Sequence, residues 1–231
     1  MNPAGLLPWY DWLALGWFLA VWVGYAWYSR RASERGTTLL AATNRYRRAW
    51  MLQATMREPR MLDGLIVQGL STSPSFFASA AILIIGGVIA LLGTANEAVR
   101  VVSQMPFLAQ TSVQVFEAKT LLLGAIFIYA FFRFSWSMRQ YTFAALMLGA
   151  MPPVEDFKSG RVDAERYADR AGTLVGMAAE TFNDGIRAYY FAFAAIAWFL
   201  SPLAMAVAAA LVAAVLYGRE FHSAVLQVLR D

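Results

Sequence analysis

Four runs of apolar residues dominate the chain, separated by segments that mix polar and apolar positions. The runs cover residues 9–28, 76–92, 121–141 and 189–217. A helix rises about 1.5 Å per residue, so about 20 apolar residues cross the ~30 Å hydrocarbon core of a bilayer. The pattern predicts an all-α integral membrane protein with four transmembrane helices, forming a single membrane domain over residues 1–231.

Two of the intervening segments, residues 37–72 and 162–186, are expected to be ordered. Each carries apolar residues at helical spacing rather than runs of Gly, Ser or Pro. This spacing is typical of amphipathic helices. We therefore expect helical segments on the cytoplasmic side of the membrane, next to the transmembrane helices.

Prolines indicate where several helices begin or end. Pro152 and Pro153 should end the third transmembrane helix, because the residue before a proline disfavours helical backbone. Ser73 followed by Pro74 is typical of a capping residue and a first helical turn, so the second transmembrane helix is expected to begin there. Pro202 falls inside the fourth run, where it should kink the helix or re-aim its outer half.

The composition supports the membrane assignment and removes several kinds of chemistry. Of the 231 residues, 59% are hydrophobic and only 15% are charged, with a mean hydropathy of +0.49. This is too apolar for an ordinary soluble domain. The chain has no cysteine and one histidine, which excludes disulfides and thiolate sites and argues against haem or zinc. We expect no metal and no cofactor.

Basic residues are concentrated on one side of the expected membrane helices. Residues 30–60 are rich in arginine, whereas the loop between the second and third runs carries Arg100 and ends near Lys119. Short loops rich in Lys and Arg stay in the cytoplasm. With four spans, both termini would lie outside the cytoplasm. The net charge of +4 follows from this bias and from attraction to anionic phospholipid of the bilayer, so we expect no nucleic-acid partner.

Six stretches of the chain together resemble a known family. They are NRYRRAWM (44–51), REPRMLDG (57–64), SFFAS (75–79), YAFFRFSWS (129–137), GAMPP (149–153) and FNDGIRAYYF (182–191). In this combination the chain resembles a bacterial inner-membrane family catalogued as a domain of unknown function, number 599. The resemblance implies a multi-pass helical protein of the inner membrane, with periplasmic termini under the charge bias. It implies no activity.

Arg133 is the most informative single residue. It lies inside the third apolar run, and the cores of the four runs contain no acidic residue. A guanidinium in hydrocarbon costs about 3 kcal/mol on insertion scales, so it must find a polar environment. Tyr129, Arg133, Ser137 and Gln140 are three or four residues apart and form one polar stripe on a helix.

Three environments for Arg133 are consistent with this stripe. The side chain would snorkel to the headgroups, or several copies of the stripe would line an anion path in a symmetric homo-oligomer, or a carboxylate would reach it from the cytoplasmic side. The carboxylates considered for that pairing are Glu58, Asp63 and Glu180.

A second candidate anion site lies at the expected start of the second helix. Ser73 brings a hydroxyl to that point, and free backbone N–H groups at a helix N-terminus favour anions. Phe76 and Phe77 would then form a hydrophobic constriction. The alternative is that the hydroxyls only cap the helix, while small residues let a neighbouring helix approach closely.

Arg45, Arg47 and Arg48 with Trp50 suit a surface that lies against anionic headgroups. A phosphate-bearing ligand or a cytoplasmic protein partner remains an alternative for them.

Arg57, Glu58, Arg60 and Asp63 are expected to form ion pairs that organise the cytoplasmic side. Catalysis by this carboxylate pair is disfavoured, because no hydroxyl, thiol or metal constellation accompanies it.

The sequence therefore predicts that the protein is not an enzyme. The first hypothesis is an oligomeric inner-membrane channel or pore that attracts anions. The alternative is a membrane-anchored scaffold or interaction protein without transport activity. The oligomeric state discriminates between them, because a channel needs a ring of subunits around an axial path.

Overall fold

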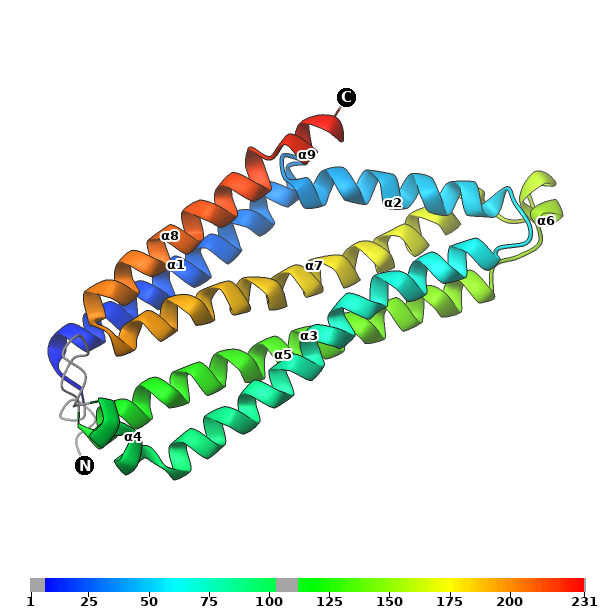
Figure 1. Cartoon of the computed structure of the whole chain (residues 1–231). Helices are drawn as coiled ribbons and strands as arrows, with labels where there is room; N and C mark the ends of the chain where they lie inside the picture. The colour runs from blue at the N-terminus through cyan, green and yellow to red at the C-terminus, as the bar shows by residue number, and fades with distance from the viewer. Residues whose placement is uncertain (1–6, 103–111, 231) are drawn as a thin grey trace.

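The computed structural model describes residues 7–102 and 112–230, and every regular element in these ranges is a helix (Figure 1). The all-α prediction is confirmed. The helices are α1 (Trp9–Glu34), α2 (Leu39–Thr55), α3 (Met61–Gly93), α4 (Ala95–Val102), α5 (Val113–Gly149), α6 (Val154–Lys158), α7 (Ala164–Ile196), α8 (Pro202–Phe221) and α9 (Ala224–Val228), with a short 3-10 turn at Ala197–Phe199.

The long helices α3, α5 and α7 run side by side through the whole molecule (Figure 1). On the free side of α7, α8 and its neighbour α1 cover one half, and α2 covers the other. We refer to these parts as the α1/α8 half and the α2 half. The helices α5 and α7 therefore connect the two halves.

Three helices are long and apolar enough to cross a membrane by length and composition. They are α3, α5 and the region from Pro202 to Val228 that begins with α8. The run over residues 9–28 forms α1, whose many tryptophans and tyrosines reduce its mean hydropathy. Both residue types favour the membrane interface, so this composition is compatible with a membrane helix.

The run over residues 189–217 does not form one kinked helix, and that prediction is wrong. The helix α7 ends at Ile196, the 3-10 turn follows, and α8 begins at Pro202 and packs back against α7 (Figure 1). Ser201 caps α8, since its hydroxyl accepts a hydrogen bond from the Ala204 N–H at 3.0 Å. Pro202 occupies the first turn, where its missing N–H costs nothing.

The other Ser-Pro pair behaves in the opposite way. The helix α3 starts at Met61 and continues through Pro74 to Gly93, so Ser73 does not cap a helix and the predicted start is wrong. The helix continues through Pro74 although Ser71, Thr72, Ser73 and Ser75 flank it. The predicted helical segment 37–72 is divided instead at the loop of residues 56–60, which contains Pro59. The helix α5 ends at Gly149, just before Pro152 and Pro153, as expected.

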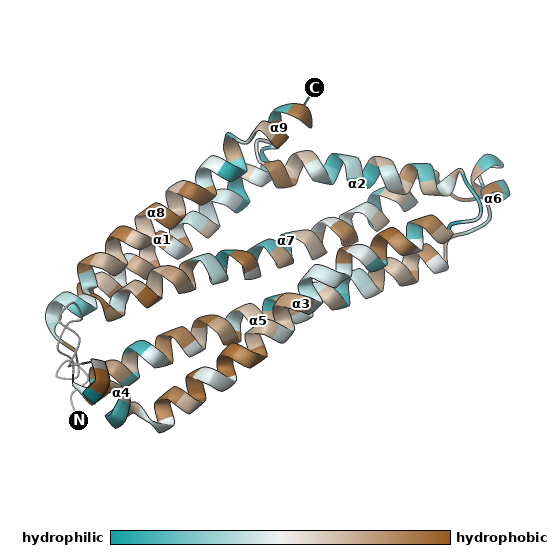
Figure 2. Cartoon of the chain, in the orientation of Figure 1, coloured by the Kyte–Doolittle hydropathy of each residue, from teal (hydrophilic) through white to brown (hydrophobic). Residues whose placement is uncertain are grey.

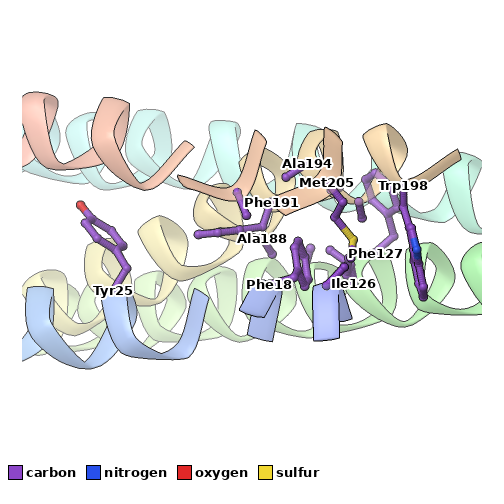
Figure 3. Close-up of a cluster of buried hydrophobic side chains, with 14 of the residues drawn as sticks. Phe18, Tyr25, Ile126, Phe127, Ala188, Phe191, Ala194, Trp198 and Met205 are labelled. Atoms are coloured by element: carbon purple, nitrogen blue, oxygen red, sulfur yellow. The ribbon is translucent and has the colours of Figure 1, made fainter. Parts of the chain in front are cut away.

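Each half has its own hydrophobic core. The core of the α1/α8 half includes Phe18, Phe191 and Trp198, which come together from α1, α7 and the 3-10 turn (Figure 3). In the α2 half, Met51 of α2 and Val175 of α7 are completely buried. The two cores meet at a level where charged side chains collect.

Candidate functional site

Charged side chains from four helices gather around one carboxylate at the junction of the two halves. They are Arg30 of α1, Arg133 of α5, Asp184 and Arg187 of α7, and Glu220 of α8. We refer to these residues as the boundary cluster. The four helices arrive here from different directions, and Asp184 lies at the centre.

Asp184 is contacted by three guanidinium groups. Arg30 Nη2 lies 2.6 Å from Asp184 Oδ2, and Arg133 Nη2 donates to the same oxygen. Arg187 Nη1 donates to the other oxygen, Oδ1, at 3.2 Å. One carboxylate thus connects α1, α5 and α7.

Arg187 extends the network to α8. Its Nη2 atom donates to Glu220 Oε2 at 3.2 Å and to Ser29 Oγ at 2.7 Å. Its guanidinium also lies over the ring of Tyr25, 5.7 Å from the centroid. Arg187 therefore holds the ends of α1 and α8 against the middle of α7.

The centre of the cluster is buried and its edge is not. The side chains of Asp184 and Arg187 are 3% and 5% exposed, whereas those of Arg133 and Arg30 are 26% and 50% exposed. Removing one partner of a buried ion pair costs about 3–5 kcal/mol, because the remaining charge stays uncompensated. The cluster is thus a strong structural constraint with one accessible guanidinium, that of Arg30.

Of the three environments expected for Arg133, the structure shows pairing with a carboxylate, and the partner is Asp184 rather than Glu58, Asp63 or Glu180. The other side chains of the polar stripe are mostly buried. Ser137 is fully buried and donates to the Ala178 carbonyl of α7 at 2.7 Å, and Gln140 is buried as well. Tyr129 is partly exposed and its ring lies edge-on to Trp22 of α1, with 5.8 Å between centroids.

Gly185 explains how α5 comes so close to Asp184. A Cβ atom at this position would lie 2.5 Å from the ring of Phe134, which directly follows Arg133 and is completely buried. Only glycine lets the ring pack against the α7 backbone. At this point α7 and α5 therefore meet twice: Asp184 pairs with Arg133, and the next residue, Gly185, packs against the ring of Phe134.

A second polar group lies at the opposite end of the α1/α8 half. The Trp198 Nε1–H donates to Asp11 Oδ1 at 2.6 Å, and Lys119 Nζ donates to the Trp198 carbonyl at 2.9 Å. All three residues are buried. Between this group and the boundary cluster the core is apolar, as seen between Trp198 and Tyr25 in Figure 3.

Sequence reasoning missed Asp184 and Glu220, and it considered Arg187 only as a partner of Glu58 or Asp63, whereas Arg187 pairs with Asp184 and Glu220. Asp184 and Arg187 lie in the stretch FNDGIRAYYF, three residues apart and just before an apolar run. This i, i+3 spacing of opposite charges was an available signal. The pairing with Arg133 was not, because the two residues lie on different helices.

Phe76 and Phe77 take different environments within the chain. Phe77 stacks on Phe134, with centroids 5.5 Å apart, and its carbonyl accepts a hydrogen bond from the Tyr189 hydroxyl at 2.9 Å. Phe76 is 67% exposed. Ser73, in the middle of α3, brings no helix N-terminus to this place, so the structural reason for an anion site there is removed.

The arginines of α2 do not share one surface. Arg47 turns inward and donates to Thr43 Oγ1 at 2.8 Å and Asn44 Oδ1 at 2.7 Å, and burial lowers the pKa of its guanidinium. Trp50 donates to Asp63 Oδ1 at 2.7 Å. Arg45 and Arg48 are exposed, and Arg48 Nε lies 3.2 Å from Asp169 Oδ1 of α7. Lipid or partner binding by Arg45 and Arg48 stays a prediction.

The loop between α2 and α3 contains the ion pairs at the far end of the α2 half. Arg57 contacts both oxygens of the buried Asp63, with its Nε 3.3 Å from Oδ2. Arg60 Nη1 lies 3.6 Å from Glu58 Oε1. Arg60 also donates to the carbonyls of Met151 at 3.1 Å and Pro152 at 2.8 Å, which ties this loop to the end of α5.

The chemistry available at these sites is ionic and hydrogen-bonding recognition. Within residues 7–102 and 112–230, no group of three or more histidine, aspartate and glutamate side chains is placed to hold a metal ion. The boundary cluster offers guanidinium donors, and Arg30 is the member best placed to reach a ligand outside the chain.

Comparison with known proteins assigns a family. No curated protein and no solved structure matches the chain. Residues 13–225 match the family described as "Protein of unknown function, DUF599". This range includes the core of the α2 half, all of the other core except Leu7, and the whole boundary cluster, and it agrees with the resemblance carried by the six sequence stretches. The chain belongs to the DUF599 family.

Proposed function

We propose that the protein is a membrane-anchored interaction protein of the bacterial inner membrane. In this proposal the α1/α8 half lies in the bilayer, the α2 half projects into the cytoplasm, and two copies associate through the exposed face of α3. The observation that carries the proposal is the group of exposed apolar residues at the start of α3, Met61, Leu62 and Leu65, in the part of this 33-residue helix that extends beyond what a bilayer can cover.

The placement in the membrane is supported by a layer without charges. In α1 no charged residue lies between Asp11 and Arg30, which are 19 positions apart and so separated by about 28 Å along the helix. This matches the ~30 Å hydrocarbon core. Asp11 belongs to the polar group near Trp198 and Arg30 to the boundary cluster, so these two groups mark the two edges of the layer.

The orientation is supported by the distribution of positive charge. Of the 19 lysines and arginines, all except Arg100 and Lys119 lie at the boundary cluster or beyond it, toward α2 and α6. Figure 2 shows the hydrophilic colour increasing in α2 and α6. Under the positive-inside rule this end faces the cytoplasm.

The resulting topology differs from the four spans expected from the sequence. Because the chain reverses between α7 and α8, we propose five crossings, by α1, α3, α5, α7 and α8. The N-terminal end of α1 is then periplasmic and the C-terminal end of α8 cytoplasmic. A periplasmic location for both termini would require residues 189–217 to cross once.

Self-association is supported by the face of α3. This helix has 33 residues and a length of about 50 Å, and its substantial packing within the chain is against α5 alone. Phe77 packs beside Phe134 at the boundary level, so residues 61–75 lie alongside the cytoplasmic half. There Met61, Leu62 and Leu65 are 74%, 61% and 58% exposed. An apolar patch beyond the bilayer marks a protein interface.

A second copy is the occupant we propose for this face. Most oligomers of one chain are closed dimers in which the same patch meets itself. The face of α3 carries no charged residue between Asp63 and Gly93. It is apolar near Met61 and again from Phe76 onward, with the exposed polar residues Gln68, Thr72 and Ser73 between these parts, so two copies can pack along it without pairing like charges. Lipid would complete the covering of the membrane part.

The anion channel stays a prediction. Its original argument was a guanidinium without a carboxylate, and Asp184 removes that argument. An anion channel would now need a ring of subunits that exposes Arg30 to an axial pore.

Site-directed cross-linking tests the proposal cleanly, because the natural chain has no cysteine. Leu65→Cys and Leu62→Cys place a thiol on the exposed cytoplasmic part of α3, and Gln53→Cys places one on exposed α2 as the matched control. In native membranes treated with a mild oxidant, we expect disulfide-linked dimers from an α3 variant and none from the control. Equal yields at all three positions, or a single-chain mass by light scattering, would refute self-association through α3.

A further inference from the structure

A groove of about 440 Å³ opens beside the boundary cluster, between α1 and α5. Its lining includes Leu19, Trp22, Val23, Ala26 and Arg30 of α1, and Tyr129 of α5. The spacing of the α1 residues places them along one face of the helix. From Leu19 to Arg30 this face extends about 16 Å, which is the length of a substantial part of an acyl chain.

The groove changes character along its length. From Leu19 to Ala26 its α1 side lies within the layer without charges and is apolar. At its other end stand the Arg30 guanidinium and the Tyr129 side chain, at the level of the boundary cluster. An elongated ligand that fits it must therefore be apolar at one end and polar at the other.

The polar end favours an anion. Arg30, Arg133 and Arg187 face the three carboxylates of Asp184, Glu220 and Glu180, so these charges balance, and the neighbouring Arg31 supplies one positive charge in excess at this end of the groove. Glu180 Oε1 lies 3.8 Å from Arg30 Nε, beyond hydrogen-bonding distance, and this glutamate is 40% exposed. A phosphate that bonds directly to the guanidinium competes well with such a contact.

A second cation stands next to the same end. The Arg31 guanidinium lies over the ring of Trp27, 4.5 Å from its centroid, and Trp27 also lines the groove. Tryptophan and arginine at the end of a membrane helix are typical of the headgroup region. The charge pattern therefore matches a lipid with a net negative headgroup better than a zwitterionic one.

We propose that this groove is a binding site for an anionic glycerophospholipid. An acyl chain lies along Leu19, Val23 and Ala26, and the phosphate is bound by the Arg30 guanidinium. This inference is independent of self-association through α3, which involves the opposite side of α5.

Native mass spectrometry of the full chain in detergent tests the site. Phosphatidylglycerol is titrated against phosphatidylcholine with the same acyl chains, and glycerol 3-phosphate is the arm that carries the headgroup without the chains. Ala26→Phe fills the groove, and Ala20→Phe, at an exposed α1 position outside the lining, is its matched control. Val23→Trp is a second groove-filling variant if Ala26→Phe does not fold.

We expect wild type and Ala20→Phe to bind phosphatidylglycerol at least tenfold more tightly than phosphatidylcholine. A groove-filling variant should lose at least tenfold of this affinity, and Arg30→Gln should lose the preference between the two lipids. Equal binding by the groove variants and the control would overturn the proposal. Glycerol 3-phosphate binding as tightly as the lipid would also overturn it, in favour of a site for soluble phosphate esters.

Discussion

The two halves of the molecule use the same long helix, α7, in different ways. In the α1/α8 half, α7 meets its neighbours through aromatic rings, as where Phe191 stacks on Trp22 with 5.5 Å between centroids. In the α2 half it meets α2 through glycines: a Cβ on Gly172 would lie 2.9 Å from the Arg48 Cα, and one on Gly176 would lie 3.0 Å from the Asn44 side chain. Bulky contacts fill the α1/α8 half, and close backbone contacts build the α2 half.

This difference has a physical reason. Under the proposed placement, the aromatic and aliphatic side chains of the α1/α8 half can face lipid as well as protein. The α2 half would lie in water, where close helix contact excludes solvent and leaves polar residues such as Arg48 on the outer side. The boundary cluster holds α7 to α1, α5 and α8.

Loss of Asp184 should have the most severe effect, since it affects both halves. Asp184→Ala leaves the guanidinium groups of Arg133 and Arg187 without their central partner, and we expect the free energy of unfolding to fall by about 3–5 kcal/mol. Denaturant titration of the full chain in detergent measures this. Asp169→Ala is the control, because Asp169 pairs with Arg48 where both are more than half exposed, and it should cost less than about 1 kcal/mol. Similar losses in the two variants would contradict a central role for the cluster.

Gly172→Ala should disturb the α2 half alone. The added methyl group meets the α2 backbone at Arg48, so α2 must move away, at a cost of about 1–3 kcal/mol. Limited proteolysis should cut α2 faster than in wild type, while the α1/α8 half stays resistant. Gly16→Ala on α1, where no atom lies within 4 Å of the new methyl, should leave the cleavage pattern unchanged.

Trp198→Phe should weaken the α1/α8 half by a smaller amount. The variant keeps the ring and removes the donor to the buried Asp11, so we expect a loss of about 1–2 kcal/mol in the free energy of unfolding. Trp17→Phe removes an indole donor at a position that is 51% exposed, and its effect should be smaller. If both substitutions have equal effects, the buried Asp11 contact is not what stabilises this end.

Much of the fold could be predicted from apolar periodicity. The helical class and the end of α5 before Pro152 follow from local rules, whereas the cytoplasmic position of the arginine-rich segment stays a prediction. The errors concern the two Ser-Pro pairs, Ser73-Pro74 and Ser201-Pro202. Local rules treat these pairs alike, and the difference is set by what α3 and α8 pack against, which the local sequence does not contain.

The candidate site was predictable only in part. Arg133 was identified as a charge that needs a partner, but Asp184 lay outside the hydropathy-defined run and was not considered. The two residues are 51 positions apart and meet only because Gly185 admits Phe134. Contacts of this kind depend on how helices pack in three dimensions. Arg57 and Asp63 were easier to pair, because they lie six positions apart in one short loop.

The location of the C-terminus tests the central claim most directly, because five crossings place it in the cytoplasm and four would place it in the periplasm. Green fluorescent protein and alkaline phosphatase, each fused after Asp231 and expressed in a bacterial host, report the side. The account predicts a fluorescent first fusion and an inactive second one. An active phosphatase with a dark fluorescent fusion would contradict the account, because residues 189–217 would then cross the membrane as a single helix.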